Sequence, residues 1–173
     1  MRFRIMMAGA AVLALAACNQ PQPLTDAQKT ALADSVDQVA TQMMASFTEH
    51  ATPEGYLSYG VTGNDRMHAE YGMIFPTYYS LVKGVRAQLR PGTAFHVSLS
   101  DKHFTVLSRD VVVLTAMIGG TMRDSAGTET PMHEAWTAVY QRSADGWKIT
   151  ADHESVAPPA PPPQAARPSA KRR

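Results

Sequence analysis

Two histidines near the end of the chain, His133 and His153, have the side chains best suited to proton transfer. Imidazole titrates near neutral pH, so a pair on neighbouring strands can act as general acid and general base. The same side chains can instead be satisfied by hydrogen bonds at the edge of a core, without chemistry. Asp152 precedes His153, and successive strand residues point to opposite faces, so a direct Asp–His dyad is not expected. His133 and His153 remain candidates for catalysis.

The chain lacks the patterns of several other chemistries. It has 173 residues and one cysteine, Cys18, so neither an intramolecular disulfide nor a cysteine-based zinc site can form. There is no His-x-His or His-x-x-x-His spacing, no glycine-rich phosphate loop and no Gly-x-Ser-x-Gly motif, so we expect no metal and no cofactor. All 15 acidic residues lie between Asp26 and Glu154. This acidic middle argues against nucleic acid as a partner, because binding phosphates requires a basic face.

Residues 1–17 have the pattern of an export signal, with two arginines followed by an apolar run too short to span a membrane. The run ends in Leu15-Ala16-Ala17-Cys18, which resembles the lipobox of bacterial lipoproteins. The resemblance implies cleavage before Cys18, lipidation of its thiol and attachment to a membrane. Asn19 follows Cys18, where an aspartate would favour retention in the inner membrane of Gram-negative bacteria. The expected location is therefore the cell envelope, on the periplasmic face of the outer membrane.

The remaining segments divide at changes in composition. Residues 18–24 are a short polar tether with two prolines, and residues 157–173 are rich in proline and end in basic residues. A segment of the latter composition cannot form a packed core, so we expect an extended or disordered tail. Residues 25–156 have globular composition and form the single predicted domain.

The first half of this domain predicts helices. Thr25 and Gln28 fit a capping box, and apolar residues then recur at helical spacing until about His50. A second helix is expected from Pro76 to the Pro91-Gly92 stop. Between them, residues 56–59 suggest a short strand, and residues 64–73 suggest a loop with a short helix.

The second half predicts long antiparallel strands. Alternating apolar residues and turn signals indicate strands over 95–100, 104–107, 111–123, 131–142 and 147–155. Helices followed by a meander of strands give an α+β fold.

The order of elements and the ending Asp145-Gly146-Trp147-Lys148-Ile149, followed by Asp152-His153, resemble the SnoaL-like and nuclear-transport-factor-2-like (NTF2-like) superfamily. The resemblance implies a cone, in which N-terminal helices pack within a curved antiparallel sheet around a pocket. Members include polyketide cyclases, ketosteroid isomerases, dehydratases, kinase association domains and modules without known activity, so fold does not fix function. Many dimerise by packing sheet on sheet.

Register determines which side chains face the pocket. A three-residue loop over 144–146 pairs Ser143 with Trp147 and sets His153 opposite Thr137. With Trp147 facing inward, the predicted pocket consists of Val113, Thr115, Met117, His133, Thr137, Val139, Ile149 and His153. A two-residue loop would instead turn Glu134, Trp136 and Tyr140 inward, because a slip of one residue flips every side chain.

The favoured register leaves an apolar outer face on the sheet. We expect a homodimer through this face, because so apolar a surface is rarely left in water. The face consists of Val112, Leu114, Ala116, Ile118, Trp136 and Tyr140.

Three functions follow from these predictions, the third being a purely structural envelope protein whose tail contacts the cell wall. The leading one is a lipid-anchored module that binds a small apolar or amphipathic molecule, or assembles with partners, without catalysis. The alternative is a cofactor-independent isomerase, cyclase or dehydratase that uses His133 or His153 as acid or base. Tyr56, Tyr59 and Tyr78 could supply hydroxyls at the pocket mouth.

Overall fold

A computed structural model describes residues 22–49 and 51–156. The predictions for residues 1–17, for Cys18 and its lipid, and for residues 157–173 lie outside the described residues. The helices are α2 (Asp26–Glu49), α3 (Pro53–Leu57) and α4 (Tyr78–Gln88), and none of them is long and apolar enough to cross a membrane. The strands are β1 (Met67–Glu70), β2 (Met73–Phe75), β3 (Ala94–Val106), β4 (Val111–Arg123), β5 (Glu129–Ser143) and β6 (Gly146–Val156).

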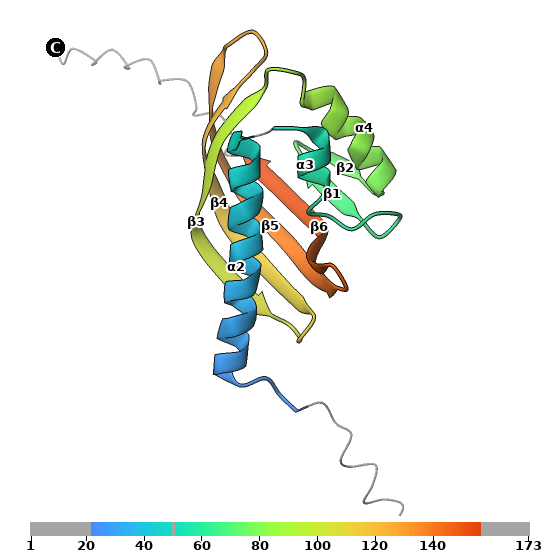
Figure 1. Cartoon of the computed structure of the whole chain (residues 1–173), viewed down its shortest axis with the longest axis vertical. Helices are drawn as coiled ribbons and strands as arrows, with labels where there is room; N and C mark the ends of the chain where they lie inside the picture. The colour runs from blue at the N-terminus through green and yellow to red at the C-terminus, as the bar shows by residue number, and fades with distance from the viewer. Residues whose placement is uncertain (1–21, 50, 157–173) are drawn as a thin grey trace, which may run out of the picture.

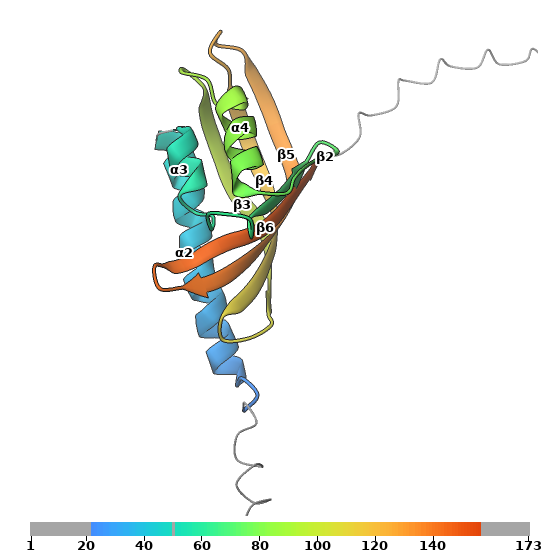
Figure 2. The ribbon, with the colours of Figure 1, turned by 90° about the vertical axis from the view of Figure 1, so that its right-hand side faces the viewer.

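The strands form one sheet of six in the order β2-β1-β6-β5-β4-β3. All neighbours are antiparallel except β1 and β6, which run parallel. The sheet curves around the helices, with α2 running along it, α3 beside α2, and α4 next to α3 (Figures 1 and 2). The predicted α+β cone is confirmed, with one parallel pair that the sequence did not indicate.

Helix α2 begins at the predicted capping box. The Thr25 amide donates to Gln28 Oε1 at 3.0 Å, and the Gln28 amide donates to Thr25 Oγ1 at 3.3 Å. One face of the helix is buried against the sheet, because its apolar residues recur at helical spacing. The buried residues are Val36, Ala40, Met43, Met44 and Phe47.

The segment between α2 and α4 departs from the prediction. The strand predicted over residues 56–59 is wrong: residues 53–57 form helix α3, because Thr52 caps the first turn and Pro53 occupies a position that favours helix initiation. Residues 67–75 form the hairpin β1–β2 instead of a loop. Helix α4 starts after Thr77 as an N-cap and was predicted.

The hairpin β5–β6 corrects the predicted register. Ser143 pairs with Gly146, so the loop has two residues, and Tyr140 pairs with Ile149. The ladder then shifts at a bulge opposite the Val139–Tyr140 step, where Thr150 is the extra residue. Beyond the bulge, Thr137 pairs with His153 as predicted. Because a bulge exchanges the two faces of a strand, Trp147 and Ile149 point inward while His153 points outward.

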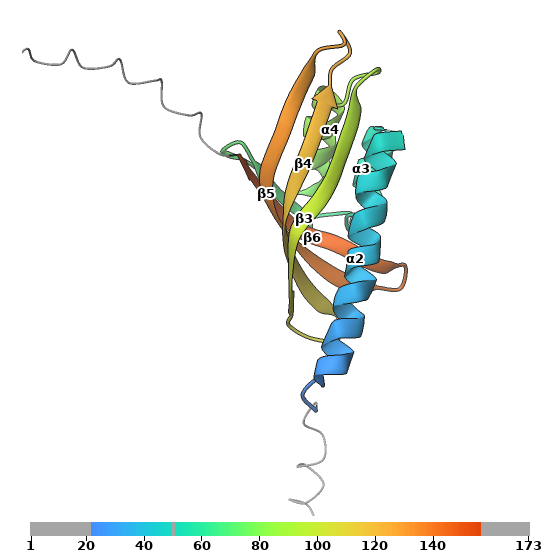
Figure 3. The same ribbon diagram turned by 90° about the vertical axis from the view of Figure 1, so that its left-hand side faces the viewer.

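The face assignment of β4 and β5 was therefore wrong. The residues predicted for the outer face are all between 0% and 5% exposed and pack in the core: Val112, Leu114, Ala116, Ile118, Trp136 and Tyr140. They cannot form a dimer interface without unfolding the domain. The opposite face of these strands carries no helix in the described part of the chain (Figure 3).

Candidate functional site

Strand β1 brings three ionisable side chains into the cone. Arg66 precedes the strand, and His68 and Glu70 follow at alternate positions, so all three point to the same face. Each is buried, whereas the intervening Met67 is 46% exposed. Parallel pairing sets His68 beside Asp152 of β6. The short strand β1 thus places Arg66 and His68 beside the acidic positions of β6.

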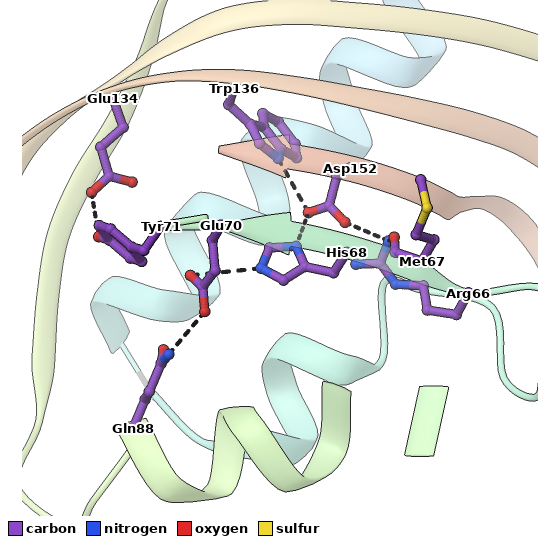
Figure 4. A network of polar contacts seen from close by, with 9 residues as sticks. All are labelled: Arg66, Met67, His68, Glu70, Tyr71, Gln88, Glu134, Trp136 and Asp152. Carbon is purple, nitrogen blue, oxygen red and sulfur yellow. Dashed lines mark hydrogen bonds and ion pairs between the residues drawn. The ribbon is translucent and has the colours of Figure 1, made fainter. Parts of the chain in front are cut away.

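Asp152 is the centre of a buried network (Figure 4). Its Oδ1 accepts a hydrogen bond from Arg66 Nη1 at 2.6 Å, and its Oδ2 accepts from the Trp136 indole at 3.3 Å. His68 Nδ1 lies 3.1 Å from the same Oδ2. Burial raises the pKa of Asp152, but the contacts with His68 and Arg66 outweigh it and lower the pKa below its usual value. Asp152 is therefore a buried anion held by two cations.

His68 is an imidazolium and not a free base. Burial lowers its pKa, but its contacts with Asp152 and Glu70 raise the pKa to about 9. The second nitrogen, Nε2, lies 3.6 Å from Glu70 Oε2, and Glu70 also accepts a hydrogen bond from Gln88 Nε2 at 2.8 Å. The two ring nitrogens lie at ion-pair distance from two carboxylates, so His68 is a buried cation between them, and an imidazolium has no lone pair for a substrate.

Glu134 of β5 lies at the other end of the network. Its Oε1 accepts a hydrogen bond from the Tyr71 hydroxyl at 2.8 Å. Its Oε2 is buried and has no hydrogen-bond partner in the described part of the chain. The residue is 3% exposed, and leaving such an oxygen unpaired costs about 1–3 kcal/mol or more. This buried oxygen is an acceptor that is free to meet a ligand.

Tyr71 adopts an unusual backbone conformation to make this contact. Tyr71 and Gly72 form the two-residue turn between β1 and β2, with φ of 47° and 76°. Such turns favour asparagine or glycine at both positions. The Tyr71 side chain is 57% exposed although its hydroxyl reaches Glu134, so this residue connects the network with the surface.

Glu154 follows Asp152 by two residues on β6 and faces the same interior. Burial raises the pKa of Glu154 to about 8; the positive charge of His68 opposes this, and the neighbouring carboxylates Asp152, Glu134 and Glu70 add to it. Glu154 is therefore protonated at neutral pH and can donate a proton or a hydrogen bond.

These groups border a cavity of about 150 Å³ between the helices and the sheet. Ionisable and other polar groups gather at one end, and the rest of the wall is apolar and partly aromatic. The polar end comprises Arg66, His68, Glu70, Tyr71, Gln88, Glu134, Asp152 and Glu154. The apolar wall comprises Met43, Met44, Phe47, Tyr56, Val85, Leu89, Phe95, Val97, Ile118, Met122, Met132, Trp136 and Ile149.

Most of the predicted pocket residues lie elsewhere. Ile149 lines the cavity, as does Tyr56. Three predicted residues, Thr115, His133 and His153, are exposed on the outer face. Four more are half-buried on that face: Val113, Met117, Thr137 and Val139. His133 and His153 do not border the cavity, so the predicted histidine pair is not assembled there.

The sequence contains one signal for this candidate site. Arg66, His68 and Glu70 alternate with apolar residues over five positions, the period of a strand with one ionisable face. The same pattern is typical of a solvent-facing strand edge, so it does not by itself indicate a buried site. The alternative register, with a two-residue loop, turns Glu134 and Trp136 inward, as the structure has them.

The site offers little to a metal ion. His68, Glu70 and Asp152 are potential ligands, but His68 lies between the two carboxylates with both nitrogens engaged. Within residues 22–49 and 51–156, no group of three or more such side chains has an arrangement that could hold a metal.

The fold and the buried polar network define an NTF2-like cone with an internal pocket. Residues 66–159 match the family model described as SnoaL-like domain. The chain belongs to the SnoaL-like domain family. No curated protein matches the sequence significantly.

Solved structures agree on the fold. A candidate dehydratase of the NTF2-like family from Streptomyces avermitilis aligns with a TM-score of 0.65 at 16% identity, covering 75% of this chain and 98% of that one. A candidate calcium/calmodulin-dependent protein kinase II association domain from Xanthomonas campestris aligns with a TM-score of 0.62 at 15% identity, covering 72% and 87%. A candidate ketosteroid isomerase from Parabacteroides distasonis aligns with a TM-score of 0.56 at 19% identity, covering 72% and 86%.

Proposed function

We propose that this SnoaL-like domain binds a small, mainly apolar molecule in the cavity and holds its polar group against Glu134. The observation that carries the proposal is the buried, unpartnered Glu134 Oε2 at one end of an otherwise apolar wall. Pockets of this kind gain affinity from apolar contact and orientation from a few polar groups. A cavity of about 150 Å³ matches one known to hold benzene, so the ligand or its buried part is compact.

The proposed role is binding without histidine chemistry. His68 borders the cavity, but it is a cation that lies between the carboxylates of Asp152 and Glu70. The exposed His133 and His153 lie away from the cavity. An isomerase or dehydratase activity stays a second candidate, because protonated Glu154 and the free oxygen of Glu134 could act as acid and base.

A cavity-filling substitution tests the binding proposal. Met44 lines the cavity, and Ala45 follows it on the exposed face of α2. Toluene should bind to the wild-type chain and to Ala45→Trp, as measured by calorimetry, but not to Met44→Trp. Both variants must first show cooperative thermal unfolding. Equal binding of toluene to all three proteins would place the ligand elsewhere and refute the proposal.

The setting of the domain is also proposed. We infer that a lipid on Cys18 anchors it to the periplasmic face of the outer membrane, on the basis of the lipobox. Cys18→Ser should abolish labelling by a palmitate analogue and move the protein out of the membrane fraction, whereas Ser143→Ala should change neither. An unchanged membrane fraction for Cys18→Ser would contradict the anchor.

A further inference from the structure

We propose that the ligand's polar group is a protonated amine, carried on a compact apolar body, and that Glu134 binds it. This inference rests on the proposed binding function and specifies its ligand class.

The two cations of the network, Arg66 and His68, are already paired with carboxylates. Arg66 contacts Asp152 Oδ1 at 2.6 Å, and His68 lies between Asp152 and Glu70. Each of these contacts is buried, so the charges are not screened by solvent. Two cations therefore neutralise the two carboxylates that they touch and leave none for Glu134.

Glu134 is a buried carboxyl group with one oxygen that lacks a hydrogen-bond donor. Its only hydrogen-bond donor among the described residues is the neutral Tyr71 hydroxyl, on Oε1, while Oε2 is buried without a partner. A buried carboxylate is stable only when it is paired and hydrogen-bonded. An ammonium supplies both the missing donor and the missing positive charge, whereas a hydroxyl supplies only the donor.

The same surroundings disfavour an anion. Glu70, Glu134 and Asp152 border the cavity, and an anionic ligand would add a further negative charge to theirs. The cavity wall also presents the rings of Phe47, Tyr56, Phe95 and Trp136. Aromatic faces attract cations, so the wall favours an ammonium over a carboxylate of the same shape.

Three probes of matched shape test the inference by calorimetry on the full chain at pH 7. Benzylamine, benzyl alcohol and benzoate differ only in the polar group on one ring. We expect benzylamine to bind about tenfold or more tighter than benzyl alcohol, the usual gain when a hydrogen bond becomes charge-assisted. Benzoate should bind weakest.

Substitutions then assign the preference to Glu134. Glu134→Gln should reduce the ratio of benzylamine to benzyl alcohol affinity to near one, because the amide keeps an acceptor but loses the charge. Glu129→Gln, on the exposed start of the same strand, should leave the ratio unchanged. If Glu134→Gln does not fold, Tyr71→Phe serves instead: it frees the second oxygen of Glu134 and should preserve or increase the ratio.

The outcomes separate the two proposals. If benzyl alcohol or benzoate binds as tightly as benzylamine, the ammonium inference is wrong while the apolar binding function stands. If toluene binds but the ratio survives Glu134→Gln, Glu134 is not the binding residue and the inference is overturned. If neither toluene nor any of the three probes binds, the binding function fails, and the inference fails with it.

Discussion

Replacing Asp152 by asparagine should destabilise the domain severely. The side chain is 2% exposed and receives Arg66 at 2.6 Å, His68 at 3.1 Å and the Trp136 indole at 3.3 Å. Asparagine is nearly the same size, so little packing is lost, but two buried cations lose their shared counter-ion. Removing one partner of a buried ion pair costs about 3–5 kcal/mol, a large part of the roughly 5–15 kcal/mol that stabilises a domain.

The loss should depend on pH in a defined way. With Asp152 gone, burial lowers the pKa of His68 against fewer contacts that raise it, chiefly Glu70, so the imidazole becomes neutral at a lower pH than in the wild type. Neutralisation removes one of the two buried cations. The penalty of Asp152→Asn should therefore be largest near pH 6 and smaller near pH 8.

Urea unfolding followed by circular dichroism at these two pH values measures the effect. Asp145→Asn, on the exposed turn of the same hairpin, is the matched control and should stay within about 0.5 kcal/mol of wild type. A loss below about 1 kcal/mol for Asp152→Asn at pH 6 would refute the reasoning that Asp152 balances two buried cations.

Three further predictions follow from the structure. The free energy of unfolding should fall by roughly 3 kcal/mol from His68 alone as pH rises from 6.5 to above 9, because a raised folded-state pKa gives stability that is complete below the unfolded pKa and is lost as pH passes the folded-state pKa. Thermal melts of the wild type and His68→Gln over this pH range check this, and parallel curves of melting temperature against pH would contradict it. Gly120→Ala should lower the free energy of unfolding by at least about 2 kcal/mol, because φ of Gly120 is 147° and a Cβ there would lie 1.9 Å from the His96 carbonyl oxygen. Gly119→Ala is the control, since a Cβ at Gly119 meets nothing within 4 Å. Equal melting temperatures for the two variants would be inconsistent with this geometry. A homodimer that packs sheet on sheet must use the outer face around Met117, so Met117→Glu should shift sedimentation toward the monomer without a change in stability. A wild-type chain that already sediments as a monomer would contradict the homodimer.

The elements that bury a periodic apolar face could be predicted from the sequence. Helix α2 has a cap and a repeated apolar stripe, and strands β4 and β5 are long enough for alternation to be clear. These elements depend on one-dimensional patterns that tertiary structure did not override. Short elements were not predictable in the same way: β1 has four residues and alternates charged with apolar side chains, which resembles an exposed segment.

The register error has a single physical origin. The predicted pairing of Thr137 with His153 was correct, and so was the inward direction of Trp147 and Ile149. Both can hold only if one residue between Ile149 and His153 is bulged out, and Thr150 is that residue. A bulge leaves no reliable mark in the composition of a strand, so the sequence allowed the two correct statements but not their consequence for the faces.

The bulge also explains how a strand of alternating character serves both the core and the site. Before Thr150, the inward positions of β6 carry Trp147 and Ile149, which pack against α2 and the sheet. After it, the inward positions carry Asp152 and Glu154, which line the polar end of the cavity. One extra residue thus separates the inward positions that pack in the apolar core from the inward positions that line the polar end of the cavity. The network around Asp152 then holds β1 against β6 and neutralises its own cations, while Glu134 keeps one buried oxygen without a hydrogen-bond partner among the described residues.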